Sequence, residues 1–392
     1  MLVPLSNVPR NYDWGSRDAI ARLQGRPASA TPEAELWFGD HPGAPAIVED
    51  GTGRTLDAWI ADEGEERGIT GPLPFLLKLL AADAPLSIQA HPTLDQARVG
   101  YAREELSSVP RDAPHRNYRD ANHKPEVIVA IAGDFEALAG FRPADELVEL
   151  LDVLGVDDPD VARLRAGLIA GGGGAGSAIA SFVGALLAGK VGGAAELIAA
   201  AHSRGVSRFA DDLAALERIE KAYPGDPGVV VALLMNRIVL TEGEALFVPA
   251  GVPHAYLRGL GVEIMAASDN VLRGGLTPKH VDVPELLRVL DTRPGHVALL
   301  APEAKAPGVV VFAPPVSDFS LTRVTREAAA DPETVLQLVG PAIAVATRGR
   351  PRLHGVGGSL ALTPGVACLI TPDEGSVRVG GTGAAFFTQP GR

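Results

Sequence analysis

The sequence predicts a mainly β protein in which a helical segment interrupts a sheet-built core. Three observations lead to this prediction. Residues 1–142 are rich in Pro, Gly and β-type runs, residues 143–224 change to helical periodicity, and residues 225–392 return to short strands punctuated by Gly and Pro. We expect the third part to return to the sheet that the first part begins.

The first part has its clearest strand signal at residues 127–131, VIVAI, which directly follow the run His123-Lys-Pro-Glu126. Glu126 is therefore expected at the entrance of a strand. A short helical patch is expected at residues 56–60.

The second part has leucines at helical spacing, and we read it as a helical insertion. The leucines are Leu147, Leu150, Leu151 and Leu154, and the pattern continues through residues 161–168, 178–202 and 209–222.

A membrane span needs to be considered at residues 166–189, which hold no charged residue and are long enough to cross a bilayer. The run GGGGAG at residues 171–176 and the lack of an aromatic belt argue against insertion. We expect a flexible glycine loop that joins two soluble helices.

The third part contains one helix candidate, residues 283–290, among its short strands. Residues 331–392 combine β-type runs with many turn residues, and no set of metal ligands occurs there. They are expected to form a small β-rich domain.

Residues 243–254, GEALFVPAGVPH, are typical of a strand, a tight turn and a second strand. Gly243 can make a sharp turn, Pro249 presets φ, and Gly251 is free to adopt positive φ. His254 is then expected to start the second strand, in a direction that the turn determines.

Other donor side chains can complete a metal site around His254. Gln89 and His91 are two residues apart, so they project side by side if the segment is a strand. Glu126 adds a carboxylate. Two imidazoles, one carboxylate and one amide oxygen suit a zinc-class divalent ion with an open position, and the lack of thiolates argues against a closed structural zinc.

Several motifs together resemble one family, the type I phosphomannose isomerases. The Gly-x5-Pro-x-Gly-x2-His spacing within residues 243–254 is also similar to the second motif of the cupin barrels. The motifs that carry the resemblance are, in chain order, NYDWGS at 11–16, AELWFGDHP at 34–42, QAHP at 89–92, NHKPE at 122–126, PAGVPHAY at 249–256 and SDNVLRGGLTPK at 268–279.

The resemblance implies a cupin-like β-barrel core with an inserted α-helical domain and a C-terminal β-rich, cupin-like domain. In this sequence the barrel would comprise residues 1–142 and 225–330, the helical insertion residues 143–224, and the C-terminal domain residues 331–392.

The resemblance also implies a zinc-dependent isomerase that interconverts mannose 6-phosphate and fructose 6-phosphate, with one Zn2+ per chain. Its metal ligands here would be Gln89, His91, Glu126 and His254. Substrate-binding residues would be Ser87, Lys78, Glu263, Lys279 and Trp14, and catalytic residues Arg273, Lys124 and Asp269.

The general base of such an isomerase stays open at this level. Glu263 and Asp269 are carboxylates near the last motif, and Lys124 is a cation beside Glu126. Lys78 lies in an apolar run, where a charge needs a partner or a functional cavity. The remaining histidines, among them His41 and His123, are expected to be structural or solvent-exposed.

Composition limits the partners. The 392 residues carry a net charge of −13, which disfavours nucleic acid and anionic membranes. The single cysteine, Cys368, excludes an internal disulfide and is typical of a reducing cytoplasm. The first ten residues lack a signal-peptide pattern. We expect a cytoplasmic monomer that binds a small phosphosugar.

Two other functions are compatible with the pattern. A cupin with two histidines and one carboxylate could bind iron(II) and activate oxygen, although Glu126 lies far from His91 for a compact motif of that kind. The chain could also be a phosphosugar-binding cupin without catalysis.

Overall fold

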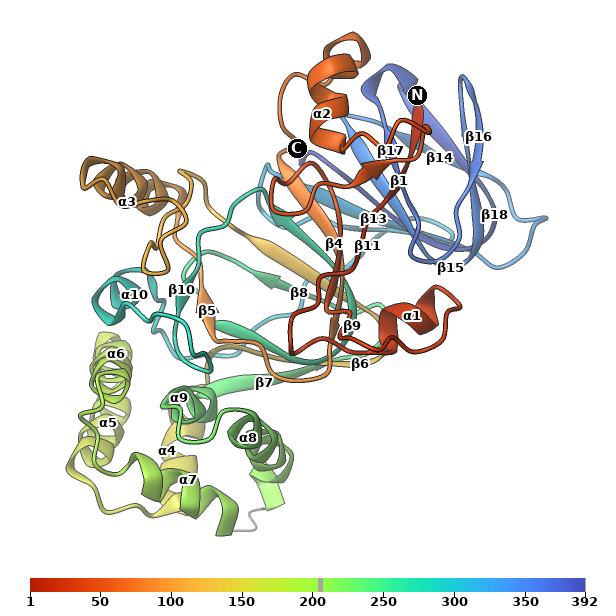
Figure 1. Cartoon of the computed structure of the whole chain (residues 1–392). Coiled ribbons are helices and arrows are strands. Elements are labelled where there is room, and N and C mark those ends of the chain that lie inside the picture. Colours follow the sequence, from red (N-terminus) through yellow and green to blue (C-terminus); the bar gives the residue numbers. More distant parts are fainter. Residues whose placement is uncertain (204–206, 392) are drawn as a thin grey trace.

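The chain forms two antiparallel sheets and one group of helices (Figure 1). This computed structural model describes residues 1–203 and 207–391. Residues 204–206, in the expected helical insertion, and residue 392, in the expected C-terminal domain, lie outside the described residues. With these two sheets, the described part of the chain is sheet-rich, as the sequence predicts.

The sheet that carries the candidate site has eight strands and lies at the centre of the molecule. Its order is β10-β5-β9-β4-β2, and β6 pairs with β7, β8 and β9. The strands are β2 (Glu35–Phe38), β4 (Phe75–Ala82), β5 (Gln89–Ala90), β6 (Glu126–Phe141), β7 (Met235–Leu240), β8 (Ala245–Val248), β9 (His254–Ala266) and β10 (Leu272–Arg273).

Strand register brings the predicted site residues together. Gln89 lies opposite His254 in the β5–β9 pair and opposite Arg273 in the β5–β10 pair. Lys78 lies opposite Glu263 in the β4–β9 pair. Opposite residues in an antiparallel pair project to the same face, so these side chains meet on one surface of the sheet.

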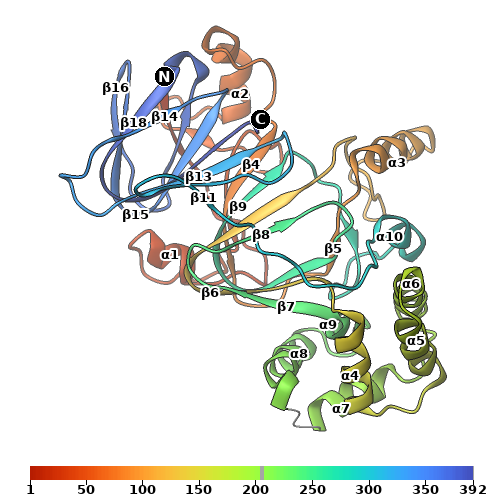
Figure 2. The same cartoon turned by 180° about the vertical axis from the view of Figure 1, so that it is seen from behind.

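The second sheet has ten strands and contains both ends of the described chain (Figure 2). Its main order is β11-β12-β13-β18-β15-β17-β1-β3. The strands are β1 (Leu2–Ser6), β3 (Ile47–Val48), β11 (Glu303–Ala306), β12 (Val309–Phe312), β13 (Ser320–Arg326), β14 (Thr334–Gln337), β15 (Ala342–Gly355), β16 (Gly358–Ala361), β17 (Ala367–Ile370) and β18 (Ser376–Gln389).

The membership of this sheet differs from the domain boundaries expected from the sequence. Strand β1 pairs with β17, and β13 pairs with β18, so residues before 7 and between 303 and 326 belong to the sheet assigned to residues 331–392. The physical reason is strand pairing between distant segments, which local sequence patterns do not encode.

A shared apolar core joins the two sheets. Leu77, Val129 and Ile264 of the central sheet belong to the same buried cluster as Leu321 and Phe386 of the second sheet. Because interiors are close-packed, this cluster fixes the two sheets face to face.

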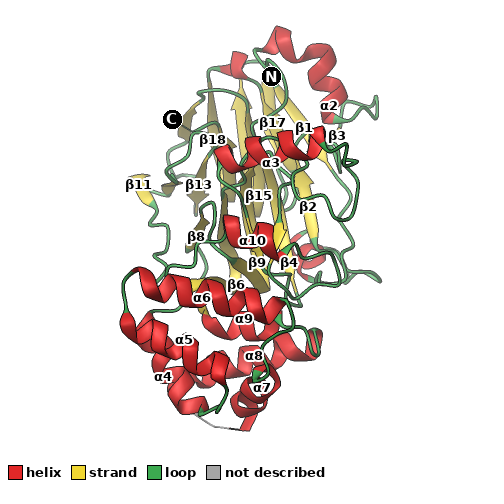
Figure 3. Ribbon diagram, turned by 90° about the vertical axis from the view of Figure 1, so that its left-hand side faces the viewer, coloured by secondary structure: helices red, strands yellow, loops and turns green. Residues whose placement is uncertain are grey.

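Six helices form the insertion and gather at one end of the molecule (Figure 3). They are α4 (Ala144–Leu154), α5 (Pro159–Ala170), α6 (Gly173–Leu187), α7 (Ala194–Ser203), α8 (Ala210–Ala222) and α9 (Gly228–Leu234). The helical segment therefore ends at Leu234, whereas the sequence predicted a return to strands after residue 224. The apolar run of α9 is buried along its whole length, so no helical periodicity marks it in the sequence.

The glycine run is mostly helical rather than a flexible loop. Helix α6 begins at Gly173, and only Gly171 and Gly172 with positive φ separate it from α5. A Cβ on Gly167 would lie 2.4 Å from Cβ of Ala178, so α5 and α6 pack too closely there for a larger residue. Among the described residues, no helix is long and apolar enough to cross a membrane.

Further helical elements lie outside the insertion or are short turns. They are α1 (Ala19–Leu23), α2 (Leu56–Trp59), a π-helical turn (Ile60–Gly64), α3 (Leu94–Leu106), α10 (Val283–Val289) and three 3₁₀ turns (Glu65–Arg67, Ser207–Phe209, Pro372–Glu374). The sequence predicted α2 and α10, and it missed α3. That helix has a capping box between Thr93 and Gln96, a local signal that could have located its start.

Candidate metal centre and substrate cavity

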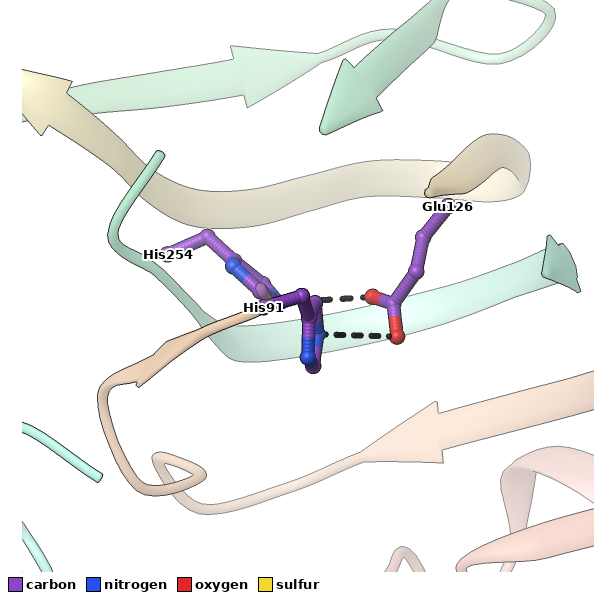
Figure 4. A group of neighbouring side chains, drawn as sticks. All are labelled: His91, Glu126 and His254. Atoms are coloured by element: carbon purple, nitrogen blue, oxygen red, sulfur yellow. Dashed lines mark ion pairs between the residues drawn. The ribbon is translucent and has the colours of Figure 1, made fainter. Parts of the chain in front are cut away.

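Three buried side chains converge in the central sheet: His91, Glu126 and His254 (Figure 4). Nε2 of His91 lies 3.2 Å from Oε1 of Glu126, and Nε2 of His254 lies 3.3 Å from Oε2. The potential ligand atoms all lie within 4.8 Å of one another. Glu126 is the first residue of β6 and His254 the first residue of β9, the two strand positions that the sequence indicates.

The hydrogen bonds of the two rings determine which nitrogens are free. Nδ1 of His91 lies 2.8 Å from the carbonyl oxygen of Asn270, and Nδ1 of His254 lies 3.2 Å from that of Val252. A carbonyl oxygen only accepts, so each Nδ1 carries the proton and donates it. Each Nε2 therefore presents a lone pair to the carboxylate of Glu126.

The arrangement fits a bound cation. Burial by itself would raise the pKa of Glu126, but the positive charge of Lys124 outweighs this effect and holds the pKa well below its usual range. Burial, and then the charge of Lys124, lower the pKa of His91 to about 4. Nε2 of His91 is buried without a hydrogen-bond partner. Lone pairs of a neutral imidazole and an ionised carboxylate that face one another suit a metal ion between them.

The turn before β9 sets the direction of His254. Gly251 has φ of +83°, and its backbone N–H donates to the carbonyl oxygen of His91 over 2.8 Å. One turn therefore positions both histidines. Glycine is favoured here because of the positive φ, and a Cβ at Gly251 would also lie a tight 3.0 Å from the carbonyl oxygen of Val289.

Gln89 borders the same centre. It lies opposite His254 in the sheet and lines a small cavity of about 50 Å³ together with Glu126, His254 and Lys124. An amide oxygen at this position could complete a four-ligand set of mixed nitrogen and oxygen donors.

A larger cavity of about 740 Å³ opens beside the centre. It is lined by eight of the residues that the sequence singled out: Trp14, Lys78, Ser87, Gln89, Lys124, Asp269, Arg273 and Lys279. Outside the His91–Glu126–His254 centre, Glu263 is the one predicted site residue that does not line it, and Glu263 lines the small cavity next to Glu126 instead. Trp14 stacks on Tyr12, another lining residue, with ring centroids 5.7 Å apart.

Lys78 has the partners that its apolar run requires. Its Nζ lies 2.9 Å from Oε2 of Glu263, 3.8 Å from Oε1 of Glu35 and 5.0 Å from the ring centre of Trp37. Burial would lower the pKa of Lys78, but the surrounding carboxylates raise it well above its usual value. Lys78 is therefore a charged ammonium on the cavity wall.

Lys124 and Glu126 form the link between the cavity and the metal centre. Nζ of Lys124 lies 2.8 Å from Oε1 of Glu126, and Lys124 lines both cavities. A positive charge therefore stands where a substrate would approach the centre.

Arg273 and Lys279 form a cationic part of the cavity wall. Within the described ranges, neither has a carboxylate within ion-pair distance. Burial and the charge of Arg119 lower the pKa of Arg273, and burial with the charges of Arg273 and Arg119 lowers that of Lys279. Cations that repel one another without a counter-ion suit an anionic ligand.

Asp269 also lies on the cavity wall, and its partner is a histidine that the sequence left as structural. Nε2 of His41 lies 3.2 Å from Oδ1 of Asp269. Burial would raise the pKa of Asp269, but the hydrogen bond from His41 and the charges of Lys124 and Arg119 lower it. His41 belongs to the motif at residues 34–42, and this motif could have marked His41 as a candidate site residue. The same motif contains Glu35, which was also missed.

The chain is similar to known proteins of one family. The family description "Phosphomannose isomerase type I, catalytic domain" matches residues 2–144. Mannose-6-phosphate isomerase of Escherichia coli K12 is 34% identical over 390 residues, which cover 97% of each chain. The Bos taurus protein of the same name is 34% identical, with 88% of this chain and 87% of that one covered.

Solved structures agree along the whole chain. Mannose 6-phosphate isomerase from Salmonella typhimurium, bound to its substrate fructose 6-phosphate and to zinc, superposes with a TM-score of 0.89 at 32% identity, and both chains are covered completely. A zinc-bound holo mannose 6-phosphate isomerase gives a TM-score of 0.88 at 31% identity with the same coverage. The similarity includes both sheets and the helical insertion, and so the chain belongs to the type I phosphomannose isomerase family.

Proposed function

We propose that this protein is a zinc-dependent isomerase that interconverts mannose 6-phosphate and fructose 6-phosphate. The observation that carries the proposal is the buried His91–Glu126–His254 centre, which adjoins a cavity with uncompensated cations. Relatives and solved structures with this activity in their names cover nearly all of the chain.

His91, Glu126 and His254 would hold one zinc ion, with Gln89 as the fourth protein ligand. A zinc ion held there would supply Lewis-acid polarisation of the sugar oxygens at the reacting carbons. Lys124, 2.8 Å from Glu126, places a further positive charge beside the oxygens on which negative charge develops.

Arg273 and Lys279 bind the phosphate group in this proposal, and the Ser87 hydroxyl donates a further hydrogen bond. These three residues line the same cavity as Lys124 and Asp269. A sugar bound there would lie between the phosphate-binding residues and the metal centre. Binding energy from the phosphate then holds C1 and C2 in place.

The reaction itself moves one proton from C2 to C1, with a compensating proton shift between O1 and O2, so that atoms and charge balance. We propose that Asp269 and Lys124 take part in these proton transfers, since one is an ionised carboxylate and the other an ammonium on the cavity wall.

The finer architecture is part of the same proposal. The central sheet would be the cupin-like barrel, the second sheet a C-terminal cupin-like domain, and the protein a cytoplasmic monomer. The single cysteine, Cys368, is buried, which is compatible with a reducing compartment.

Metal content and activity test the proposal together. The purified protein is expected to contain roughly one zinc per chain, to lose isomerase activity to a chelator, and to regain it with zinc. A tightly bound metal without isomerase activity would point to a different reaction, and a protein that binds no metal would refute the centre.

The Arg273→Ala variant distinguishes phosphate binding from metal binding. Loss of a charge-assisted hydrogen bond is worth about 1.5–3 kcal/mol, so kcat/KM should fall roughly 10- to 100-fold while zinc content is unchanged. Steady-state kinetics and metal analysis of the variant check this. Unaltered turnover would show that the assignment of Arg273 is mistaken.

A further inference from the structure

His41 and Asp269 form a pair at the edge of the substrate cavity. His41 lies in the loop after β2, and Asp269 lies in the loop after β9. Their Nε2 and Oδ1 atoms are 3.2 Å apart. Asp269 lines the 740 Å³ cavity and His41 does not, so His41 can act on a bound sugar only through a neighbour such as Asp269 or Trp37, which packs against its ring and also lines the cavity.

The surroundings of His41 determine its tautomer. The backbone N–H of Gly43 donates to Nδ1 over 3.0 Å, so Nδ1 carries no proton. The proton of the neutral ring is then on Nε2, which points at the carboxylate. Trp37 meets the ring edge-on with centroids 5.0 Å apart, and the side chain of His41 is only 12% exposed. The ring is therefore a fixed hydrogen-bond donor.

The backbone of Asp269 is fixed separately from its side chain. Its N–H donates to Oδ2 of Asp120 over 2.8 Å, and Oδ1 of Asp120 accepts from the hydroxyl of Ser268 over 2.9 Å. The side chain of Asp269 is 44% exposed. Within residues 1–203 and 207–391, the only side chain at hydrogen-bond or ion-pair distance from the carboxylate of Asp269 is that of His41.

We propose that His41 is a positioning residue for the isomerase reaction: its Nε2–H holds the carboxylate of Asp269 in the orientation that faces the sugar. This inference rests on the proposed function and adds to it a residue outside the cavity. Without the donor, a half-exposed carboxylate is free to rotate towards water or towards the cations Lys124 and Arg119, which act on it electrostatically. A small displacement of a group that faces the substrate can lower the reaction rate strongly.

Two substitutions at His41 separate donation from packing. His41→Gln retains a donor near the Nε2 position, and His41→Phe fills similar space without a donor. We expect His41→Phe to lower kcat on the order of 10- to 100-fold, with KM and zinc content changed less than about threefold, and His41→Gln to recover most of the loss. Equal losses in both variants, or no loss in His41→Phe, would refute the proposal.

His202→Phe is the matched control. His202 also pairs with a carboxylate, since its Nε2 lies 2.9 Å from Oε2 of Glu220, but the pair is on the helical insertion, with side chains 34% and 33% exposed. The same change there is expected to leave kcat within about twofold, because no group near the cavity moves.

A double-mutant cycle tests whether His41 acts through Asp269. In an Asp269→Asn background, His41→Phe should lower kcat by less than about twofold, since the carboxylate that it orients is gone. Multiplicative losses would mean that His41 acts by another route and would overturn the proposal.

An NMR experiment keeps the inference separate from the proposed function. In protein labelled with 15N-histidine, the His41 ring is expected as the Nε2–H tautomer, and Asp269→Asn should shift its Nε2–H resonance. Inactive wild-type protein with this signature would refute the function alone. A ring protonated on Nδ1 instead would refute the pairing, whatever the activity.

Discussion

Lys78 illustrates at the scale of one residue how a buried charge is accommodated. It is enclosed between Glu35 and Glu263 and faces the ring of Trp37. Trp37 in turn donates its indole N–H to Oε2 of Glu35 over 2.6 Å. Removal of the ammonium would leave two carboxylates close together in a buried region, which is more costly than removal of a complete ion pair.

The Lys78→Met variant is therefore expected to lose about 3–5 kcal/mol of unfolding free energy. The double variant Lys78→Met/Glu263→Gln should recover at least about 1 kcal/mol of that loss, because one unpaired carboxylate is gone. Urea unfolding of the three proteins measures both quantities. A double variant less stable than Lys78→Met would contradict the pairing of Lys78 with Glu263.

At the scale of an element, the turn that precedes β9 connects sequence to site. Positive φ at Gly251 allows its N–H to reach the carbonyl oxygen of His91, and the strand that follows begins with His254. The motif therefore encodes more than a turn, because it also links the two histidines through the backbone.

Gly251→Ala tests this link. The new Cβ would be strained at φ of +83° and would lie 3.0 Å from the carbonyl oxygen of Val289, so both the turn and His254 must shift. We expect a stability loss of about 1–3 kcal/mol and weaker zinc binding, measured by chelator competition. Gly53→Ala is the control, since Gly53 has φ of +71° with nothing near its Cβ. Equal zinc affinity in both variants would contradict this role.

Glu136 attaches the helical insertion to the central sheet. Its buried carboxylate accepts from Arg218 of α8 and Arg237 of β7, with Nη2–Oε2 and Nε–Oε1 distances of 2.6 Å and 2.5 Å. Burial would raise the pKa of Glu136, but the two arginines lower it below its ordinary value of 4.5.

The sign of the resulting pH dependence follows from the lowered pKa. The ionised carboxylate stabilises the fold fully above pH 4.5, the ordinary value, and this contribution disappears as pH falls through the lower folded-state pKa. Glu136→Gln should cost about 1–3 kcal/mol at pH 7, and the difference from wild type should shrink in acid. Thermal unfolding between pH 7 and 3 measures it, with exposed Glu217→Gln as the control. A pH-independent difference would contradict the ion-pair account.

At the scale of the whole molecule, the second sheet contacts the segment that carries Lys124. Asp318 lies in the loop between β12 and β13, and its Oδ2 lies 3.0 Å from Nε2 of His123. His123 directly precedes Lys124, so the second sheet helps to hold the segment that carries Lys124 beside the metal centre.

Asp318→Ala is expected to lower stability by about 1 kcal/mol and kcat/KM roughly fivefold, because His123 and the adjacent Lys124 lose one restraint. Ser317→Ala, in the same loop, is the control and should change neither quantity. Urea unfolding and steady-state kinetics check the pair of variants. Full activity of Asp318→Ala would show that the second sheet supports the fold without supporting the site.

Two of the candidate metal ligands could be placed at strand starts from the sequence because each is next to a strong local signal. Glu126 precedes a β-branched run, and His254 follows a Pro–Gly turn, so strand starts and directions are encoded nearby. Their metal-ligand role, and those of Arg273 and Asp269, stay proposals. His41 could not be assigned in the same way, because its significance depends on Asp269, which another strand brings to it.

The sequence by itself determined the order of strands, helices and strands, the positions of the main turns, and the residue types of the candidate site. Only the tertiary structure decided that β1 and β11–β13 join the second sheet, that α9 is a buried helix, and that Lys78 stands between Glu35 and Glu263. The physical reason is range. Periodicity and turn chemistry act over a few residues, whereas strand partners and buried charge pairs depend on packing between segments far apart in the chain.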